Sequence, residues 1–282
     1  MHEDLISKIK FAANTFTNAE RKIAEYILQN PHKVLYMSIT ELAAICEVGD
    51  TSVFRFCKHL NKKGYMDFKM DLAQTLTTRE EFTSIDTQES KDSLALMAQQ
   101  SINDGLAAMH ETLNINGLDT IRTIAEKMSK ASNVFFFGAG SSMASAYEGY
   151  CRFMRICPSV RCEFGSHMQS MHASLMKEGD VAIAFSYLGA TKDTIDTAKI
   201  AREAGATVVG ITRFSNSALT DICDHVLLCG ANENPNQSGS FSGKVAQLFL
   251  LDLLYTEFFN MQLPQSKLNR NKCMQAISDK LM

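Results

Sequence analysis

The spacing of apolar residues divides the chain into an all-helical first part and a second part in which strands and helices alternate. Up to residue 76, apolar side chains recur every three or four positions, as they do on one face of a helix. From residue 133 onward, short continuous apolar runs alternate with stretches of helical spacing, which is typical of parallel strands covered by helices. The expected fold is therefore an all-α domain followed by an α/β domain with a doubly wound parallel sheet.

Helix boundaries in the first part are marked by residue types that favour helix ends. Residues 17–20 (TNAE) and 38–41 (SITE) are capping boxes, in which a hydroxyl and a carboxylate each satisfy a backbone N–H group. Asn30-Pro31 is expected to end the helix that begins at residue 17, because proline disfavours helical geometry in the residue before it. Further helices are expected over residues 51–60 and 65–76.

The short capped helix after Ser38 and the helix over residues 51–60 together predict a helix-turn-helix module. The second helix of this module enters the major groove of DNA, where polar side chains reach base edges and lysines beyond the helix end suit phosphates. Asp67 is the only acidic residue between Thr51 and Lys69, a segment that carries six basic residues when histidine is counted. DNA contacts are therefore predicted from Thr51, Ser52, Arg55, Lys58, His59, Lys62 and Lys63. The alternative is a solvated basic face on a plain helical bundle.

A polar segment separates the two parts of the chain. Residues 77–91 are acidic in balance and lack apolar periodicity, which predicts a linker between a domain of residues 1–76 and a domain of residues 92–282. The second domain is expected to begin with two amphipathic helices, at residues 92–113 and 118–128. Strands are predicted at 134–137, 159–164, 181–186, 207–212 and 225–229, helices between them at 143–156, 167–176, 191–204 and 217–222, and a last apolar helix at 244–260.

Two glycine-containing turns are candidates for an anion site. In Asn133–Ser142 (NVFFFGAGSS), Gly138 and Gly140 allow a sharp turn after a buried strand, and two serines follow where a helix begins. Residues 186–191 (SYLGAT) form a second strand–glycine–hydroxyl–helix junction. Backbone N–H groups, the positive end of a helix dipole and hydroxyl donors together suit a phosphate. A dinucleotide site is disfavoured because Met143 occupies the place of the third glycine.

Composition and charge limit the classes of partner. The net charge of −3 excludes a globally basic nucleic-acid binder, so any DNA contact must come from a local patch. The eight cysteines form no C-x-x-C pair, and no His/Cys set has zinc spacing, so neither a metal nor another cofactor is expected. The N-terminus lacks the apolar core of a signal peptide, and no segment is expected to span a membrane. These features predict a cytoplasmic protein with reduced thiols.

The chain resembles the RpiR family of bacterial transcriptional regulators in three stretches, SITELAAICEVGDTSVFRFCKHLNKKGYMDFKMDLA, FFFGAGSS and SYLGATKDTI. Members of this family join an N-terminal helix-turn-helix to a C-terminal sugar isomerase (SIS) domain. The resemblance covers nearly the whole chain. It implies a SIS domain that binds a phosphosugar effector and has no catalytic activity.

The resemblance also implies which residues surround the phosphosugar. Ser142 matches the serine of the family's G-x-G-x-S loop, and residues 186–191 match a second loop of the form S-x-S-G-x-T. Leu188 stands where the second loop has another serine, and Glu47 and Gly49 replace the usual Gly-Val-Ser turn of the helix-turn-helix. The implied ligand set is Gly138, Gly140, Ser141, Ser142, His167, Ser186, Tyr187, Gly189 and Thr191.

Several polar residues near the expected loops keep two interpretations each. His167 donates to a sugar hydroxyl or bonds a carbonyl at its helix terminus. Glu163 and Glu148 are the nearest carboxylates for an isomerase base, although a salt bridge is favoured for both. Arg213 meets a phosphate at the rim of the sheet or is a solvated loop arginine. Residues 237–242 (QSGSFS) are a candidate for a loop that closes over ligand.

The function predicted from these features is a DNA-binding regulator controlled by a phosphorylated sugar or amino sugar. A homo-oligomer, dimer or tetramer, acting on an inverted-repeat operator is expected, without a membrane partner. The alternative is a sugar-phosphate isomerase with a helical N-terminal appendage, but no convincing general base lies beside the loops. A third possibility is a phosphosugar sensor that acts on a protein partner.

Overall fold

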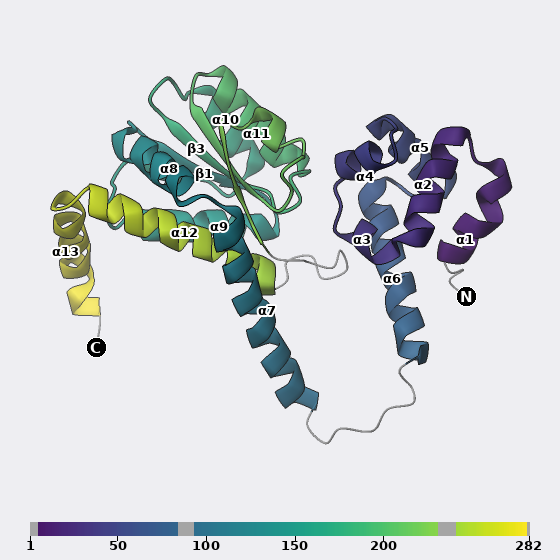
Figure 1. Cartoon of the computed structure of the whole chain (residues 1–282). Helices are drawn as coiled ribbons and strands as arrows, with labels where there is room; N and C mark the ends of the chain where they lie inside the picture. The colour runs from purple at the N-terminus through teal and green to yellow at the C-terminus, as the bar shows by residue number, and fades with distance from the viewer. Residues whose placement is uncertain (1–4, 84–92, 231–240, 281–282) are drawn as a thin grey trace. The chain divides into compact units, whose positions relative to one another are not determined.

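The computed structural model describes residues 5–83, 93–230 and 241–280 (Figure 1). The described chain forms two compact units. One contains the N-terminal helices up to residue 100, and the other contains residues 101–230 and 241–280. Among the helices that the structure describes, none combines the length and the hydropathy of a transmembrane segment.

The N-terminal unit is all helical, as predicted. Its helices are α1 (Leu5–Ala12), α2 (Asn18–Gln29), α3 (Pro31–Leu35), α4 (Ile39–Ile45), α5 (Asp50–His59) and α6 (Tyr65–Thr83). Both capping boxes are present, at Thr17 with Glu20 and at Ser38 with Glu41. The inner face of α5 is fully buried, with Phe56 between the rings of Phe16 and Phe68.

Helix α2 ends at Gln29, as Asn30-Pro31 predicted, and Pro31 also begins the short helix α3, which the sequence did not predict, because proline is well tolerated in the first turn of a helix. The predicted end of the helix over residues 65–76 was wrong. Helix α6 continues to Thr83 instead of ending at Leu76. The sequence of its last turns is rich in Glu, Arg and Thr and lacks the apolar stripe from which a helix is predicted. The rest of the predicted linker, residues 84–91, lies outside the described residues.

The second unit is built on a five-stranded, all-parallel sheet, which confirms the predicted fold class. Its strands are β1 (Val134–Gly138), β2 (Val160–Cys162), β3 (Val181–Phe185), β4 (Thr207–Thr212) and β5 (His225–Leu228), in the order β2-β1-β3-β4-β5. Strand β2 is three residues long instead of the six predicted, and the helix predicted at 217–222 is a 3₁₀ turn at Thr220–Ile222. Both differences occur at the edges of the sheet, where fewer contacts impose regular structure.

Helices cover both faces of the sheet (Figure 1). The helices of this unit are α7 (Ser93–Ile115), α8 (Leu118–Lys130), α9 (Ser141–Phe153), α10 (Ser166–Ser174), α11 (Lys192–Glu203), α12 (Phe241–Met261) and α13 (Gln265–Ile277), of which α13 follows the end of α12 and does not cover the sheet. Phe136 points into a core formed with α8, α9 and α12, whereas Phe135 and Phe137 point into the opposite core, with α10 and α11. The apolar helix α12 therefore lies in the core of this unit.

Candidate functional site

The two glycine loops leave the sheet side by side at its topological switch point. Strand β1 lies between β2 and β3, so the chain turns in opposite directions along the sheet after β1 and after β3. Gly138 of β1 and Phe185 of β3 are paired in register, and each strand is followed by a loop and a helix. Ligands of such sheets bind at this crevice, where the helix N-termini carry partial positive charge.

The first loop requires glycine at both predicted positions. Gly140 precedes α9 with φ of +55°, a conformation that residues with side chains rarely adopt. A Cβ atom at Gly138 would lie 3.0 Å from the carbonyl oxygen of Ser142. Ser141 is exposed at the start of α9 and Ser142 is buried beside it. The glycines shape the turn, and the two serines begin the helix as predicted.

Gln169 on α10 holds this loop in place and was not identified from the sequence. Its Oε1 accepts a hydrogen bond from the Gly138 N–H at 3.2 Å, and its Nε2 donates to the Gly138 carbonyl at 2.9 Å. The same Nε2 donates to the carbonyl of Glu163 at 2.8 Å. Because Gly138 uses both of its backbone polar groups in this way, its role is to shape the loop and its N–H does not face a ligand.

The second loop is closed by its own side chains. The Ser186 hydroxyl is buried, donates to Thr191 Oγ1 at 3.0 Å and accepts from the Thr191 N–H at 3.4 Å. Gly189 has φ of +64°, and a Cβ atom there would lie 2.2 Å from Ser217 Oγ. Leu188 packs against the hydrophobic core. Ser186 and Gly189 therefore fix the loop, and Thr191 is exposed at the start of α11 while its Oγ1 accepts from Ser186.

Tyr187 is likewise part of the loop framework. Its side chain is buried, and its carbonyl accepts hydrogen bonds from Thr212 Oγ1 at 3.1 Å and from the Arg213 N–H at 2.7 Å. Arg213 itself forms an ion pair with Glu111, with 3.4 Å between Nη2 and Oε1. The structure thus gives the Arg213 side chain a partner on α7.

A lysine beside the first loop supplies a positive charge that the sequence analysis missed. Lys244, in the first turn of α12, donates from Nζ to the Ser141 carbonyl, to Ser145 Oγ at 3.1 Å and to Gln247 Oε1 at 3.3 Å. It is the only basic residue between positions 241 and 261, which was a signal available in the sequence. Its ammonium group lies at the N-terminal turn of α9, where an anion would also be favoured by the helix dipole.

The remaining candidate ligand and base residues of the second unit lie in or just before α10. His167 is exposed in the first turn of this helix. Glu163 forms an ion pair with His172, with 3.5 Å between Oε1 and Nε2, which confirms the salt-bridge interpretation for this carboxylate. The candidate closing loop, residues 237–242, lies mostly outside the described residues.

In the N-terminal unit, helix α5 presents part of the predicted basic face to solvent. Thr51, Arg55, Lys58 and Lys63 are exposed and Ser52 is half-buried. The turn before α5 contains Glu47 with φ of +55°, at the position where the family pattern has glycine. Gly49 is the N-cap of α5 and provides no side-chain cap, as the sequence indicated.

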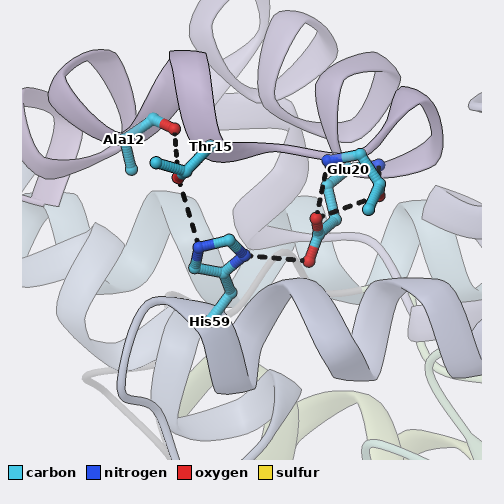
Figure 2. A network of polar contacts seen from close by, with 5 residues as sticks. Ala12, Thr15, Glu20 and His59 are labelled. Carbon is cyan, nitrogen blue, oxygen red and sulfur yellow. Dashed lines mark hydrogen bonds and ion pairs between the residues drawn. The ribbon is translucent and has the colours of Figure 1, made fainter.

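Among the predicted DNA contacts, the side chains of His59 and Lys62 have polar partners elsewhere in the unit. Figure 2 shows the His59 ring between Glu20 and Thr15, with Nδ1 3.1 Å from Glu20 Oε1 and Nε2 3.2 Å from Thr15 Oγ1. Lys62 Nζ lies 2.5 Å from Asp71 Oδ2, and both side chains are largely buried. These two side chains tie α5 and its following turn to α2 and α6.

Lys69 also departs from the predicted surface cluster, because it is buried. Its Nζ donates to the carbonyls of Leu35 at 3.1 Å and Met37 at 2.9 Å, and lies 5.4 Å from the centre of the Tyr65 ring. Burial lowers the pKa of Lys69 to about 8, against an opposing effect of the Glu41 carboxylate. The charge of this residue is therefore directed at the end of α3 and not at solvent.

Comparison with known proteins accounts for both units. Residues 3–79 match a family model described as "Helix-turn-helix domain, rpiR family", and residues 127–257 match the SIS domain. An HTH-type transcriptional regulator of Haemophilus influenzae is 34% identical over 257 residues, which cover 89% of this chain and 88% of that protein. The HTH-type transcriptional regulator HexR of Pseudomonas aeruginosa is 29% identical, over 90% of this chain and 88% of HexR.

One solved structure is similar to this chain over nearly its whole length. The Vibrio vulnificus NanR protein complexed with ManNAc-6P superposes with a TM-score of 0.87 at 25% sequence identity, covering 98% of this chain and 99% of that chain.

Proposed function

The chain belongs to the RpiR family of helix-turn-helix transcriptional regulators with a SIS domain and is a regulator, not an enzyme. We propose that a phosphorylated sugar or amino sugar bound in the SIS domain controls its binding to DNA. The observation that carries this proposal is the pair of loops at the β1/β3 switch point, each ending at a helix N-terminus. The likeness to NanR, solved with ManNAc-6P, supports the same ligand class.

The phosphate of the effector would lie between the first turns of α9 and α11. Backbone N–H groups at both helix starts would donate to it, together with the hydroxyls of Ser141, Ser142 and Thr191. Lys244 would balance its charge by exchanging part of its present bonding to Ser141 and Ser145 for the phosphate. His167 remains a proposed donor to a sugar hydroxyl. The glycines, Ser186 and Tyr187 would hold the loops in shape.

The DNA side of the function belongs to helix α5. Its N-terminal half would enter the major groove with Thr51, Ser52 and Arg55 toward base edges, and Lys58 and Lys63 toward bases or phosphates. A two-fold symmetric homo-oligomer would match an inverted-repeat operator. Action on an operator also implies a cytoplasmic location, where the DNA of a bacterial cell lies.

Thermal unfolding with a panel of hexose and hexosamine phosphates tests the effector half of the proposal. A ligand that binds the folded state alone stabilises it by about 2.7 kcal/mol at a concentration of 100 times Kd, so the midpoint should rise with the correct sugar phosphate and not with the unphosphorylated sugar. Ser142→Ala and Lys244→Met should abolish most of this rise. Lys199→Met, an exposed lysine paired with Glu203 on α11, should retain it.

Two outcomes would contradict the proposal. One is a panel in which no phosphorylated sugar raises the midpoint of the wild-type chain, and the other is an equal rise in Ser142→Ala, Lys244→Met and the wild type. The second result would mean that the phosphate is held away from the first loop.

A further inference from the structure

An exposed aromatic ring lies on the polar face of helix α5. Phe54 is 44% exposed, whereas the other apolar side chains of this helix are fully buried. Residues three or four positions apart are neighbours on one face of a helix, so Phe54 is a neighbour of Thr51 and Lys58 on the exposed side of α5, and Arg55, four positions after Thr51, lies on the same side. The ring therefore interrupts the surface that is proposed to face DNA.

The Phe54 ring is held on two sides. Its Cε2 atom lies 3.6 Å from the point that a Cβ atom would occupy at Gly64, so the ring rests on the turn between α5 and α6. Lys58 Nζ lies 5.3 Å from the ring centre, within the range of a cation–π contact. A ring supported in this way keeps its outward edge in a defined place before any partner arrives.

We infer that Phe54 contacts the C5-methyl group of a thymine in the major groove and makes the protein specific for that base pair, an inference that rests on the proposed binding of operator DNA. The thymine methyl is the apolar group that base pairs display in this groove, and phenylalanine is among the side chains that contact it. Lys58, held against the ring, would then lie beside the same base step.

Charge around the ring favours DNA over a protein as the partner. Arg55 and Lys58 flank Phe54 on the exposed face, and no acidic residue occurs from Thr51 to Met66. Cationic side chains around one apolar contact complement a polyanion that carries a methyl group in its groove. An apolar protein surface would instead have to desolvate both charges.

Replacement of thymine by deoxyuridine tests the inference directly, because it removes only the methyl group. The full-length chain would first select its operator from a random duplex pool, and each thymine of the selected site would then be replaced singly. We expect one thymine in each half-site whose replacement weakens binding about four-fold, the factor that burial of one methyl group corresponds to. Phe54→Ala should bind the unmodified operator more weakly and should not distinguish thymine from deoxyuridine at that position.

Phe11 provides a matched control, because it is 93% exposed on α1 and lies outside α5. Phe11→Ala should retain the full sensitivity to deoxyuridine. A selected operator that tolerates deoxyuridine at every position would overturn the role of Phe54 while leaving DNA binding intact. Failure of the wild-type chain to select any sequence would overturn the proposed operator binding and this inference with it. Equal deoxyuridine sensitivity in Phe54→Ala and the wild type would assign the methyl contact to another residue.

Discussion

Lys69 is a charged residue in the interior of the N-terminal unit, with 2% of its surface exposed. The carbonyls of Leu35 and Met37 accept its hydrogen bonds at the C-terminal end of α3, where the helix dipole favours a cation. Burial nevertheless lowers its pKa to about 8, below the usual lysine value. The unfolded chain therefore binds this proton more tightly than the folded chain does.

This difference predicts an unusual pH dependence of stability. Between about pH 8 and pH 10.5 the unfolded state holds more protons at Lys69, so the free energy of unfolding of the N-terminal unit should rise with pH by an amount on the order of 3 kcal/mol. Hydrogen exchange of amides in α3 and α6 at pH 7.5 and 9.5, corrected for intrinsic rates, measures the part of this rise that falls between these two pH values, about 2 kcal/mol.

Lys69→Met serves as the reference for that measurement, because it keeps the length of the side chain and removes the titrating group. Its protection should lack the rise, although it should be less stable overall, since two buried carbonyls lose their donor. The same rise in both proteins would show that another group titrates.

Side chains with long-range partners were the ones that sequence reasoning placed wrongly or missed. Lys69 was counted among the basic residues that follow α5, because its acceptors, the carbonyls of Leu35 and Met37, lie at and just after the end of α3, a helix that the sequence did not predict. Gln169 and Lys244 act on the first loop from 31 and about 100 positions away along the chain. The glycine loops themselves were predictable, because turn conformation and helix starts are local properties.

At the scale of single elements, the N-terminus of α5 is less stable than it could be. Gly49 occupies the N-cap with φ of −84° and provides no hydroxyl, and a Cβ atom there would lie 3.6 Å from Thr51 Oγ1, an ordinary contact. Gly49→Ser should therefore raise the free energy of unfolding of the N-terminal unit by about 0.5–1 kcal/mol, through a new cap and a less flexible unfolded chain.

The capping box at α2 calibrates this prediction. Thr17→Ala removes a hydroxyl that accepts from the Glu20 N–H at 3.3 Å, and it should lower stability by about 1 kcal/mol. Urea unfolding of both variants against the wild type gives the two changes. A Gly49→Ser variant that is no more stable than the wild type would show that the serine cannot adopt the capping geometry.

Strands and most helices were predictable because they depend on local patterns. Strands β1 and β3 are buried at every position and appear in the sequence as continuous apolar runs. The length of β2 depends instead on the contacts of an edge strand, on which apolar spacing carries no information. The last turns of α6 carry no apolar stripe in the sequence, so the end of this helix was also predicted wrongly.

At the scale of the whole molecule, the proposed homo-oligomer has a candidate surface on and beside α10. Exposed apolar residues spaced by three or four positions form a stripe there, consisting of Phe164, Met168, Met171 and Leu175. If this stripe is the interface, Met171→Glu should halve the mass measured by sedimentation velocity, because a buried unpaired carboxylate is strongly disfavoured. Lys199→Glu, on the exposed polar face of α11, should keep the wild-type mass. An unchanged mass in Met171→Glu would place the interface elsewhere.

The proposed regulation also requires that effector and operator binding change one another equally. If the phosphosugar changes the operator Kd by some factor, thermodynamic linkage requires that the operator change the phosphosugar Kd by the same factor, and useful regulation corresponds to about 5–150-fold. Titration calorimetry of the effector with and without operator, and of the operator with and without effector, gives both factors.

Without effector, Ser142→Ala should bind operator like the wild type, because Ser142 lies in the SIS unit and α5 in the other. Its operator binding should no longer respond to the effector. Two unequal factors would mean that the ligand acts on a species outside this equilibrium, such as a different oligomer. Equal factors of one would remove the phosphosugar from the regulation of DNA binding.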